Sequence, residues 1–114
     1  MSDGRDEVAL EHMLRYAQEA VALCQDKTRP DLDQDRLLNL AVVRLLEIIG
    51  EAANRISSET QILYPQIPWP QIVSLCNRLI HGYDSVDFDI VWQIIRQDLP
   101  PLIEQLEAIV ADFE

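Results

Sequence analysis

The stretch LNLAVVRLLEIIGEAANRI, residues 38–56, decides the fold class, because its apolar residues recur every three or four positions. This period is typical of one face of an amphipathic helix. The apolar face is so wide that the helix is expected to pack against two neighbours, or against its own chain on one side and a second copy on the other. We therefore expect a homodimer. Gly50 costs ~1 kcal/mol relative to alanine in mid-helix, and a close approach by another helix would compensate for it.

The same period predicts a helix before this stretch. Apolar residues between Val8 and Cys24 recur at helical spacing, which predicts a first helix at about residues 6–25. The segment DKTRPDLDQD, residues 26–35, contains a proline and several turn formers, so it is expected to be a connection. Asp31 or Asp33 can cap the long helix that follows.

Prolines set the next boundaries. The stretch QILYPQIPWPQ, residues 61–71, holds three prolines in six residues and is not expected to form a regular element. Pro70 suits the first turn of a third helix, where its missing N–H is no loss. Gly82 is the natural C-terminal stop of that helix.

The C-terminal part of the chain should again be helical. Asp87 can cap a fourth helix, and the pair Pro100 and Pro101 predicts a kink or a break near Asp98. One kinked helix or two consecutive helices would complete the chain. No alternation typical of strands appears. We therefore predict an all-α fold, an antiparallel bundle of four to five helices, with residues 1–114 forming a single domain.

The composition limits the partners of this chain. Its 20 acidic residues against 9 lysines and arginines give a net charge of −11, so it lacks the basic surface of a general nucleic-acid binder. Any RNA contact must be local, and no DNA partner is expected. The charged start of the chain and the absence of a long apolar run predict a cytoplasmic protein with no membrane partner. Cys24 and Cys76 form no CxxC pair and no ligand cluster with His12 and His81, so we expect free thiols and no metal site.

Chemistry can be read from SLCNRLIHGYD, residues 74–84. Arg78 and His81 stand three positions apart, on the same side of the predicted helix. The imidazole can transfer a proton near neutral pH, the guanidinium can hold a phosphate, and Tyr83 adds a hydroxyl. Such a set suits phosphodiester cleavage without a metal or a cofactor. Alternatively, Arg78 and His81 only interact with the C-terminal end of the helix, while Tyr83 packs or caps.

Two longer runs carry a family resemblance: RLLEIIGEAANRIS, residues 44–57, and YPQIPWPQIVSLCNRLIHGYDSVDFDIVWQIIRQDLPPL, residues 64–102. With GEAA, IPW, NRLIHGY and VW followed by DLP in this order, the chain resembles the HepT-like branch of the HEPN superfamily. These are all-α ribonuclease toxins paired with a minimal nucleotidyltransferase antitoxin. The resemblance implies a homodimer that cuts RNA, either tRNA or mRNA, at a cleft between the subunits. It also implies that the antitoxin attaches AMP to Tyr83.

One position departs from the family motif, which is an arginine, four residues, a histidine, any residue and a tyrosine. His81 and Tyr83 match it, but Cys76 stands at the position of the arginine. A thiol cannot replace a planar, permanently charged group with five donors. Loss of such a donor commonly costs about 10² to 10³ in rate. Arg78 projects about 200° away from position 76, so a simple exchange of roles is not expected.

The departure leaves three explanations open: natural decay of the toxin, an inactivating substitution that spares the host, or a site for which Arg78 and His81 suffice. It also leaves a second function open. In that hypothesis the chain is a catalytically inactive binding or regulatory protein that still dimerises and binds a nucleotidyltransferase.

Weaker candidates lie on other predicted helices. Glu47 and Glu51, with Arg44 beside them, could face a cleft beneath the motif helix, or could form a charged strip on an exposed face. Trp69 and Trp92 are expected to be core or interface anchors and not platforms for base stacking.

Overall fold

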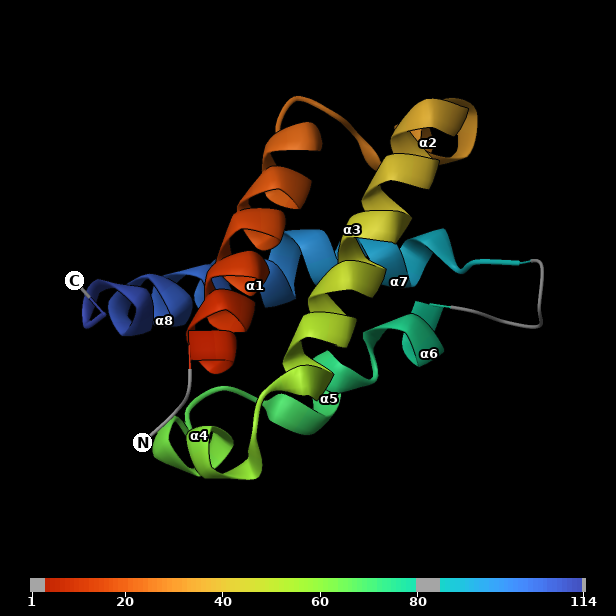
Figure 1. Cartoon of the computed structure of the whole chain (residues 1–114). Helices are drawn as coiled ribbons and strands as arrows, with labels where there is room; N and C mark the ends of the chain where they lie inside the picture. The colour runs from red at the N-terminus through yellow and green to blue at the C-terminus, as the bar shows by residue number, and fades with distance from the viewer. Residues whose placement is uncertain (1–3, 80–84, 114) are drawn as a thin grey trace.

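The structure is a computed structural model that describes residues 4–79 and 85–113. Every regular element in these two ranges is a helix (Figure 1), which confirms the all-α class. The elements are α1 (Gly4–Leu23), α2 (Arg29–Gln34), α3 (Arg36–Arg55), α4 (Ser58–Leu63), α5 (Trp69–Val73), α6 (Leu75–Leu79), α7 (Phe88–Gln93), the π-helical segment η1 (Ile94–Asp98) and α8 (Leu99–Ala111). None of these helices is long and apolar enough to cross a membrane.

Helix α3 is the centre of the bundle. Figure 1 shows α1 and α3 as two long helices that run in opposite directions. Helix α3 packs against α1, against the short helices α5 and α6, and against α2, while α8 packs against α1. The motif helix α6 is therefore carried on α3, and α7 lies against α6.

The wide apolar face of α3 is used within the chain. Val42, Leu46, Ile49 and Ala53 are fully buried, and α1 and the α5–α6 pair supply the neighbours. This packing accounts for the width of the face without a second copy of the chain. On α3, Leu37 stays 81% exposed.

Gly50 allows α5 to approach α3 closely, as its position in the middle of the helix predicts. A Cβ added to Gly50 would lie 3.1 Å from the carbonyl oxygen of Ile72 and 3.5 Å from that of Val73. A Cβ atom, which cannot donate a hydrogen bond, rarely lies as close as 3.1 Å to another atom. The close helix approach predicted from the sequence is therefore confirmed.

Two predictions about the connections are wrong. The segment expected to be only a connection contains α2, because the carboxylate of Asp31 accepts a hydrogen bond from the N–H of Thr28 at 2.7 Å and stabilises the first turn. Asp31 is thereby used by α2, and Asp35, not Asp31 or Asp33, caps α3 by accepting from the N–H of Leu38 at 3.1 Å.

The proline-rich stretch is also more helical than expected. Its first residues belong to α4, because the hydroxyl of Ser57 accepts a hydrogen bond from the N–H of Thr60 at 3.3 Å and caps that helix. These short helices explain why the structure has more elements than the predicted four to five. The long helices themselves agree with the prediction.

The later boundaries largely follow the prolines. Pro70 lies in the first turn of α5, as predicted, but the expected third helix is divided into α5 and α6 at Ser74. Asp87 caps α7 by accepting from the N–H groups of Asp89 and Ile90. Near Asp98 the helix changes its type but is not broken: the π-helical segment η1 ends there, α8 begins at the next residue with prolines in its first turn, and Asp98 keeps helical backbone angles. Gly82 lies outside the described residues.

Candidate functional site

The end of α6 and the residue that caps α7 lie next to each other, on either side of the part of the motif segment that the structure does not describe. Helix α6 ends at Leu79, whose carbonyl oxygen accepts a hydrogen bond of 2.8 Å from the N–H of Asp87, the cap of α7. His81 and Tyr83 lie outside the described residues, and so does the side chain of Cys76. Their roles stay predictions.

Arg78 is the catalytic candidate from this segment whose surroundings the structure shows. Its Nη2 lies 3.3 Å from Oδ2 of Asp98, and both side chains are about one-third exposed, at 34% and 37%. The two residues belong to different elements, α6 and the end of η1. The ion pair therefore joins the motif helix to the C-terminal part of the chain.

Arg78 and Asp98 line a pocket of about 280 Å³, here called the Arg78 pocket. Apolar side chains of α5, α6, η1 and α8 form much of its wall, and glutamines from four segments also line it. Gln105 reaches across to donate a hydrogen bond of 3.2 Å to the carbonyl oxygen of Gln66. The sequence prediction did not include these glutamines or Asp98, although Asp98 belongs to the DLP element of the family resemblance.

The three candidates on α3 form a charged strip. Nη1 of Arg44 lies 3.3 Å from a carboxylate oxygen of Glu51 and 3.9 Å from one of Glu47. None of the three lines the Arg78 pocket. A surface strip of this kind needs no ligand to explain it, and a role in a cleft stays a prediction.

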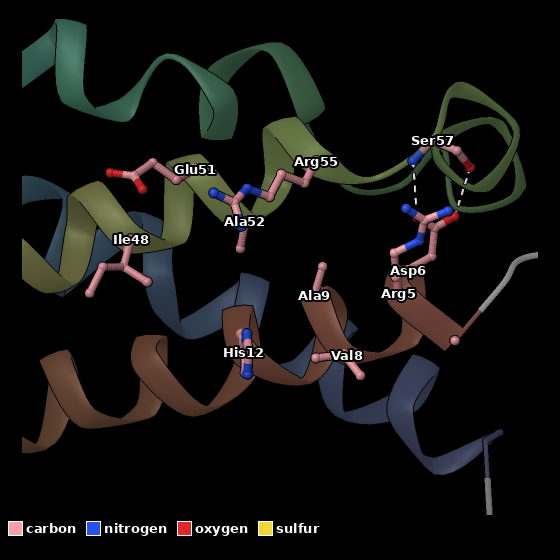
Figure 2. A pocket seen from close by; sticks show the side chains of 11 residues that line it. Arg5, Asp6, Val8, Ala9, His12, Ile48, Glu51, Ala52, Arg55 and Ser57 are labelled. Atoms are coloured by element: carbon pink, nitrogen blue, oxygen red, sulfur yellow. Dashed lines mark hydrogen bonds between the residues drawn. The ribbon is translucent and has the colours of Figure 1, made fainter.

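A larger groove of about 1230 Å³ lies between α1 and α3, and Glu51 lines it. Figure 2 shows Ala9 of α1 and Ala52 of α3 pointing toward each other across it. Arg55 and the half-buried His12 also line the groove. The ring of His12 lies 5.8 Å from that of Tyr16, one turn further along α1.

Asp6 closes one end of this groove and is only 6% exposed. Its carboxylate accepts hydrogen bonds from the hydroxyl of Thr60 at 2.6 Å and from the hydroxyl of Ser57 at 2.7 Å (Figure 2 draws the Ser57 bonds). Burial raises the pKa of Asp6, but the hydrogen bonds from Thr60 and Ser57 outweigh it, so the pKa lies below its ordinary value. These bonds tie the start of α1 to α4.

The two tryptophans are anchors, as predicted. Trp69 is buried, and its Nε1 donates to the carbonyl oxygens of Gln61 and Tyr64 at 3.1 Å each. Trp92 is partly buried under the guanidinium of Arg96, whose carbon lies 4.3 Å from the ring centroid. Neither ring lines the Arg78 pocket.

Cys24 and the possible metal ligands do not form a second site among the described residues. Cys24 is a buried free thiol, and burial raises its pKa, which makes it unreactive. Within residues 4–79 and 85–113, no group of three histidine, cysteine or acidic side chains could hold a metal ion.

Comparison with known proteins places the chain among ribonuclease-like sequences. Residues 13–109 match the family model described as "Ribonuclease HepT-like". A protein of Thermococcus cleftensis named "Probable ribonuclease HepT" is 36% identical over 95 residues, which cover 80% of this chain and 86% of that protein. A protein of Methanocaldococcus jannaschii named "Putative RNase MJ1380" is 31% identical over 97 residues, which cover 85% of this chain and 89% of that protein. No solved structure matches.

The match and the helical architecture agree with each other. The family model covers nearly the whole chain, including the motif helix α6 and the segment on either side of it. We conclude that the chain belongs to the HepT-like ribonuclease family of the HEPN superfamily.

Proposed function

We propose that this chain is a HEPN-type ribonuclease toxin that cuts RNA without a metal. The observation that carries the proposal is the match of residues 13–109 to the HepT-like ribonuclease model, which includes the whole motif segment. His81 acts as general acid or base, and Arg78 stabilises the negative charge that develops on the phosphate. Relatives of similar length that are named as ribonucleases support the same reaction class.

The proposal includes the partners of the toxin. The chain, a single domain, acts in the cytoplasm as a homodimer, with tRNA or mRNA as its substrate. A minimal nucleotidyltransferase is its antitoxin and silences it by attaching AMP to the hydroxyl of Tyr83. A net charge of −11 supports a small local RNA site and argues against an extended basic groove.

A second function is favoured by one specific observation. Cys76 stands at the position of the motif arginine, and the carboxylate of Asp98, 3.3 Å from Arg78, reduces the positive charge that Arg78 could offer in place of that arginine. On this basis the chain is a catalytically inactive binding or regulatory protein that keeps the dimer and the nucleotidyltransferase partner. Cys76 is then a natural decay of the toxin or an inactivating substitution that spares the host, whereas in an active enzyme Arg78 and His81 suffice.

The deciding experiment is RNA cleavage in the presence of EDTA. Purified chain, Cys76→Arg and Cys76→Arg with His81→Ala are incubated with total tRNA and with mRNA. If Cys76→Arg cuts and the added His81→Ala abolishes cutting, the fold is a toxin silenced at one residue. If the chain as given already cuts, Arg78 and His81 suffice. If none of the three proteins cuts any RNA, the ribonuclease proposal fails and the binding function replaces it.

The antitoxin part of the proposal has its own test. The chain and Tyr83→Phe are each incubated with a nucleotidyltransferase encoded beside the gene and with ATP, and intact masses are measured. The expected result is addition of AMP to the chain and none to Tyr83→Phe. Equal modification of both proteins would show that Tyr83 is not the acceptor.

A further inference from the structure

The Arg78 pocket has the chemical character of a ligand site. Its apolar lining consists of the exposed Pro68 and Pro101 and of aliphatic side chains that are at most 4% exposed, among them Ile72, Leu75, Leu99 and Leu102. A few polar side chains also line it. Small-molecule sites usually combine mostly apolar walls with a few polar groups that orient the ligand. The volume of about 280 Å³ lies at the small end of such sites, so it suits one compact group and not an extended one.

Arg78 is the one cation among the described residues that line this pocket. Asp98 engages a single terminal nitrogen of its guanidinium, at 3.3 Å, and a guanidinium carries five N–H donors. An ion pair between side chains that are one-third exposed contributes at most about 1 kcal/mol in most measured cases. Arg78 therefore retains donors for one phosphate while Asp98 holds its orientation.

Two glutamines bring side-chain amides to the pocket. Gln71 on α5 and Gln97 on η1 are both exposed and line the pocket from different elements. Neither side-chain amide bonds another described residue. An amide donates and accepts at the same time, which matches the paired donors and acceptors on the edge of an unpaired base.

We propose that the Arg78 pocket binds one nucleotide of a single-stranded RNA. Its phosphate pairs with Arg78, its base packs against the apolar lining at Pro68 and Pro101, and the amides of Gln71 and Gln97 bind the edge of the base. This inference rests on the proposed function, because it assigns part of the RNA substrate to a pocket whose Arg78 lies three residues before His81. It adds a subsite that selects a base beside the point of cleavage.

The charge of the pocket favours a strand over a free nucleoside triphosphate. One arginine can balance one phosphate, and the carboxylate of Asp98 opposes any further negative charge. Gln71 and Gln97 are exposed, so the pocket is open to solvent and the ribose-phosphate chain of a bound nucleotide can continue out of it.

RNA binding by charge-changing glutamine variants tests this subsite. Fluorescence anisotropy of a labelled, single-stranded RNA of mixed sequence is measured in EDTA with the chain, Gln71→Glu and Gln97→Glu. Each variant removes amide donors and adds a negative charge, so affinity should fall about tenfold. Gln93→Glu is the matched control, because Gln93 is an exposed glutamine on α7 outside the pocket. Its RNA affinity should stay within a factor of two of the unmodified chain.

Competition by AMP and by inorganic phosphate shows whether the pocket binds a nucleotide within an RNA strand, a free nucleotide or phosphate alone. The expected order of affinity is RNA strand, then AMP, then phosphate alone, with both Gln71→Glu and Gln97→Glu weakening AMP as well as RNA. Equal RNA affinity of all three glutamine variants would place the RNA elsewhere and overturn the inference. AMP that binds as tightly as the strand would show a free-nucleotide site and overturn the RNA assignment.

These measurements distinguish failure of the nucleotide subsite from failure of the proposed ribonuclease function. Cutting by Cys76→Arg together with glutamine variants that bind RNA normally would leave the ribonuclease and remove the subsite. Failure of the chain to bind either RNA or AMP would also remove the subsite, whatever the cleavage result. Glutamine-dependent AMP binding without any cleavage by Cys76→Arg would remove the ribonuclease and keep a nucleotide pocket.

Discussion

The guanidinium of Arg78 and the carboxylate of Asp98 lie 3.3 Å apart and join the motif helix α6 to the junction of η1 and α8. The pair is partly exposed, so its direct contribution to folding is small. Its position matters more than its strength, because Asp98 is the one acidic side chain among the described residues that line the Arg78 pocket. Asp98 thus reduces the positive charge that Arg78 offers to RNA.

Asp98→Asn should strengthen RNA binding several-fold with little effect on stability. The substitution removes a negative charge beside the phosphate position, while the change in unfolding free energy stays below about 1 kcal/mol. Anisotropy and urea unfolding measure the two effects. Glu104→Gln, on an exposed position of α8, removes the same charge outside the pocket. An equal gain in both variants would mean that only net charge matters.

RNA binding should depend weakly on salt. Each neutralised phosphate of a single strand contributes a slope of about −0.7 to the plot of log affinity against log salt. With one or two phosphates bound, the slope should lie between about −0.7 and −1.4. A titration series in NaCl measures it. A slope steeper than about −3 would indicate an extended basic surface and contradict the local site.

Gly50→Ala should destabilise the fold by about 1–3 kcal/mol. Alanine is the better helix former by ~1 kcal/mol, but its Cβ would lie 3.1 Å from the carbonyl oxygen of Ile72 and force α5 away from α3. Gly4→Ala is the matched control, since a Cβ there meets nothing within 4 Å. Unfolding in urea measures the free energy of unfolding of both variants and of the unmodified chain. A Gly50→Ala variant as stable as Gly4→Ala would show that α5 does not approach α3 closely.

Asp6→Asn should destabilise the chain at neutral pH by about 1–3 kcal/mol, because an amide cannot accept all the hydrogen bonds from Ser57 and Thr60. The folded pKa of Asp6 lies below the ordinary value of 3.8. The stabilisation by the carboxylate is therefore complete above pH 3.8 and is lost as the pH falls through the lower, folded-state pKa.

Unfolding of the chain and Asp6→Asn at several pH values measures this loss. Asp26→Asn, at an exposed aspartate beyond the end of α1, is the control and should change little at any pH. A constant difference between the chain and Asp6→Asn down to the lowest pH would show that the carboxylate is not specifically stabilised.

Arg96→Ala should destabilise the chain by about 1–2 kcal/mol. Nη2 of Arg96 donates to the carbonyl oxygens of Cys24 and Lys27 at 2.9 Å each, and the guanidinium stacks on Trp92. These contacts hold the end of α1 against η1. Arg15→Ala, on the exposed face of α1, is the control and should cost less than about 0.5 kcal/mol. Equal losses would show that the contacts of Arg96 contribute nothing specific.

Local pattern predicted the long helices well and the short ones poorly. The period of three and four residues predicted the course of α1 and α3, and prolines predicted the start of α5 and the change of helix type at Asp98. The helices α2 and α4 were missed because each has only six residues, too few to show a period. Their stability comes from capping by Asp31 and Ser57, which local composition does not distinguish from a turn.

The sequence by itself determined the all-α class, the family and the motif residues, because helical period and motif spacing are properties of neighbouring positions. Only the tertiary structure decided which charges meet. Arg78 pairs with a carboxylate 20 residues later, and Asp6 binds hydroxyls 51 and 54 residues away. Such contacts depend on how α3 packs between α1 and the α5–α6 pair, and no local pattern encodes that packing. The Arg78 pocket exists because α5, the stretch before it, α6, η1 and α8 meet there.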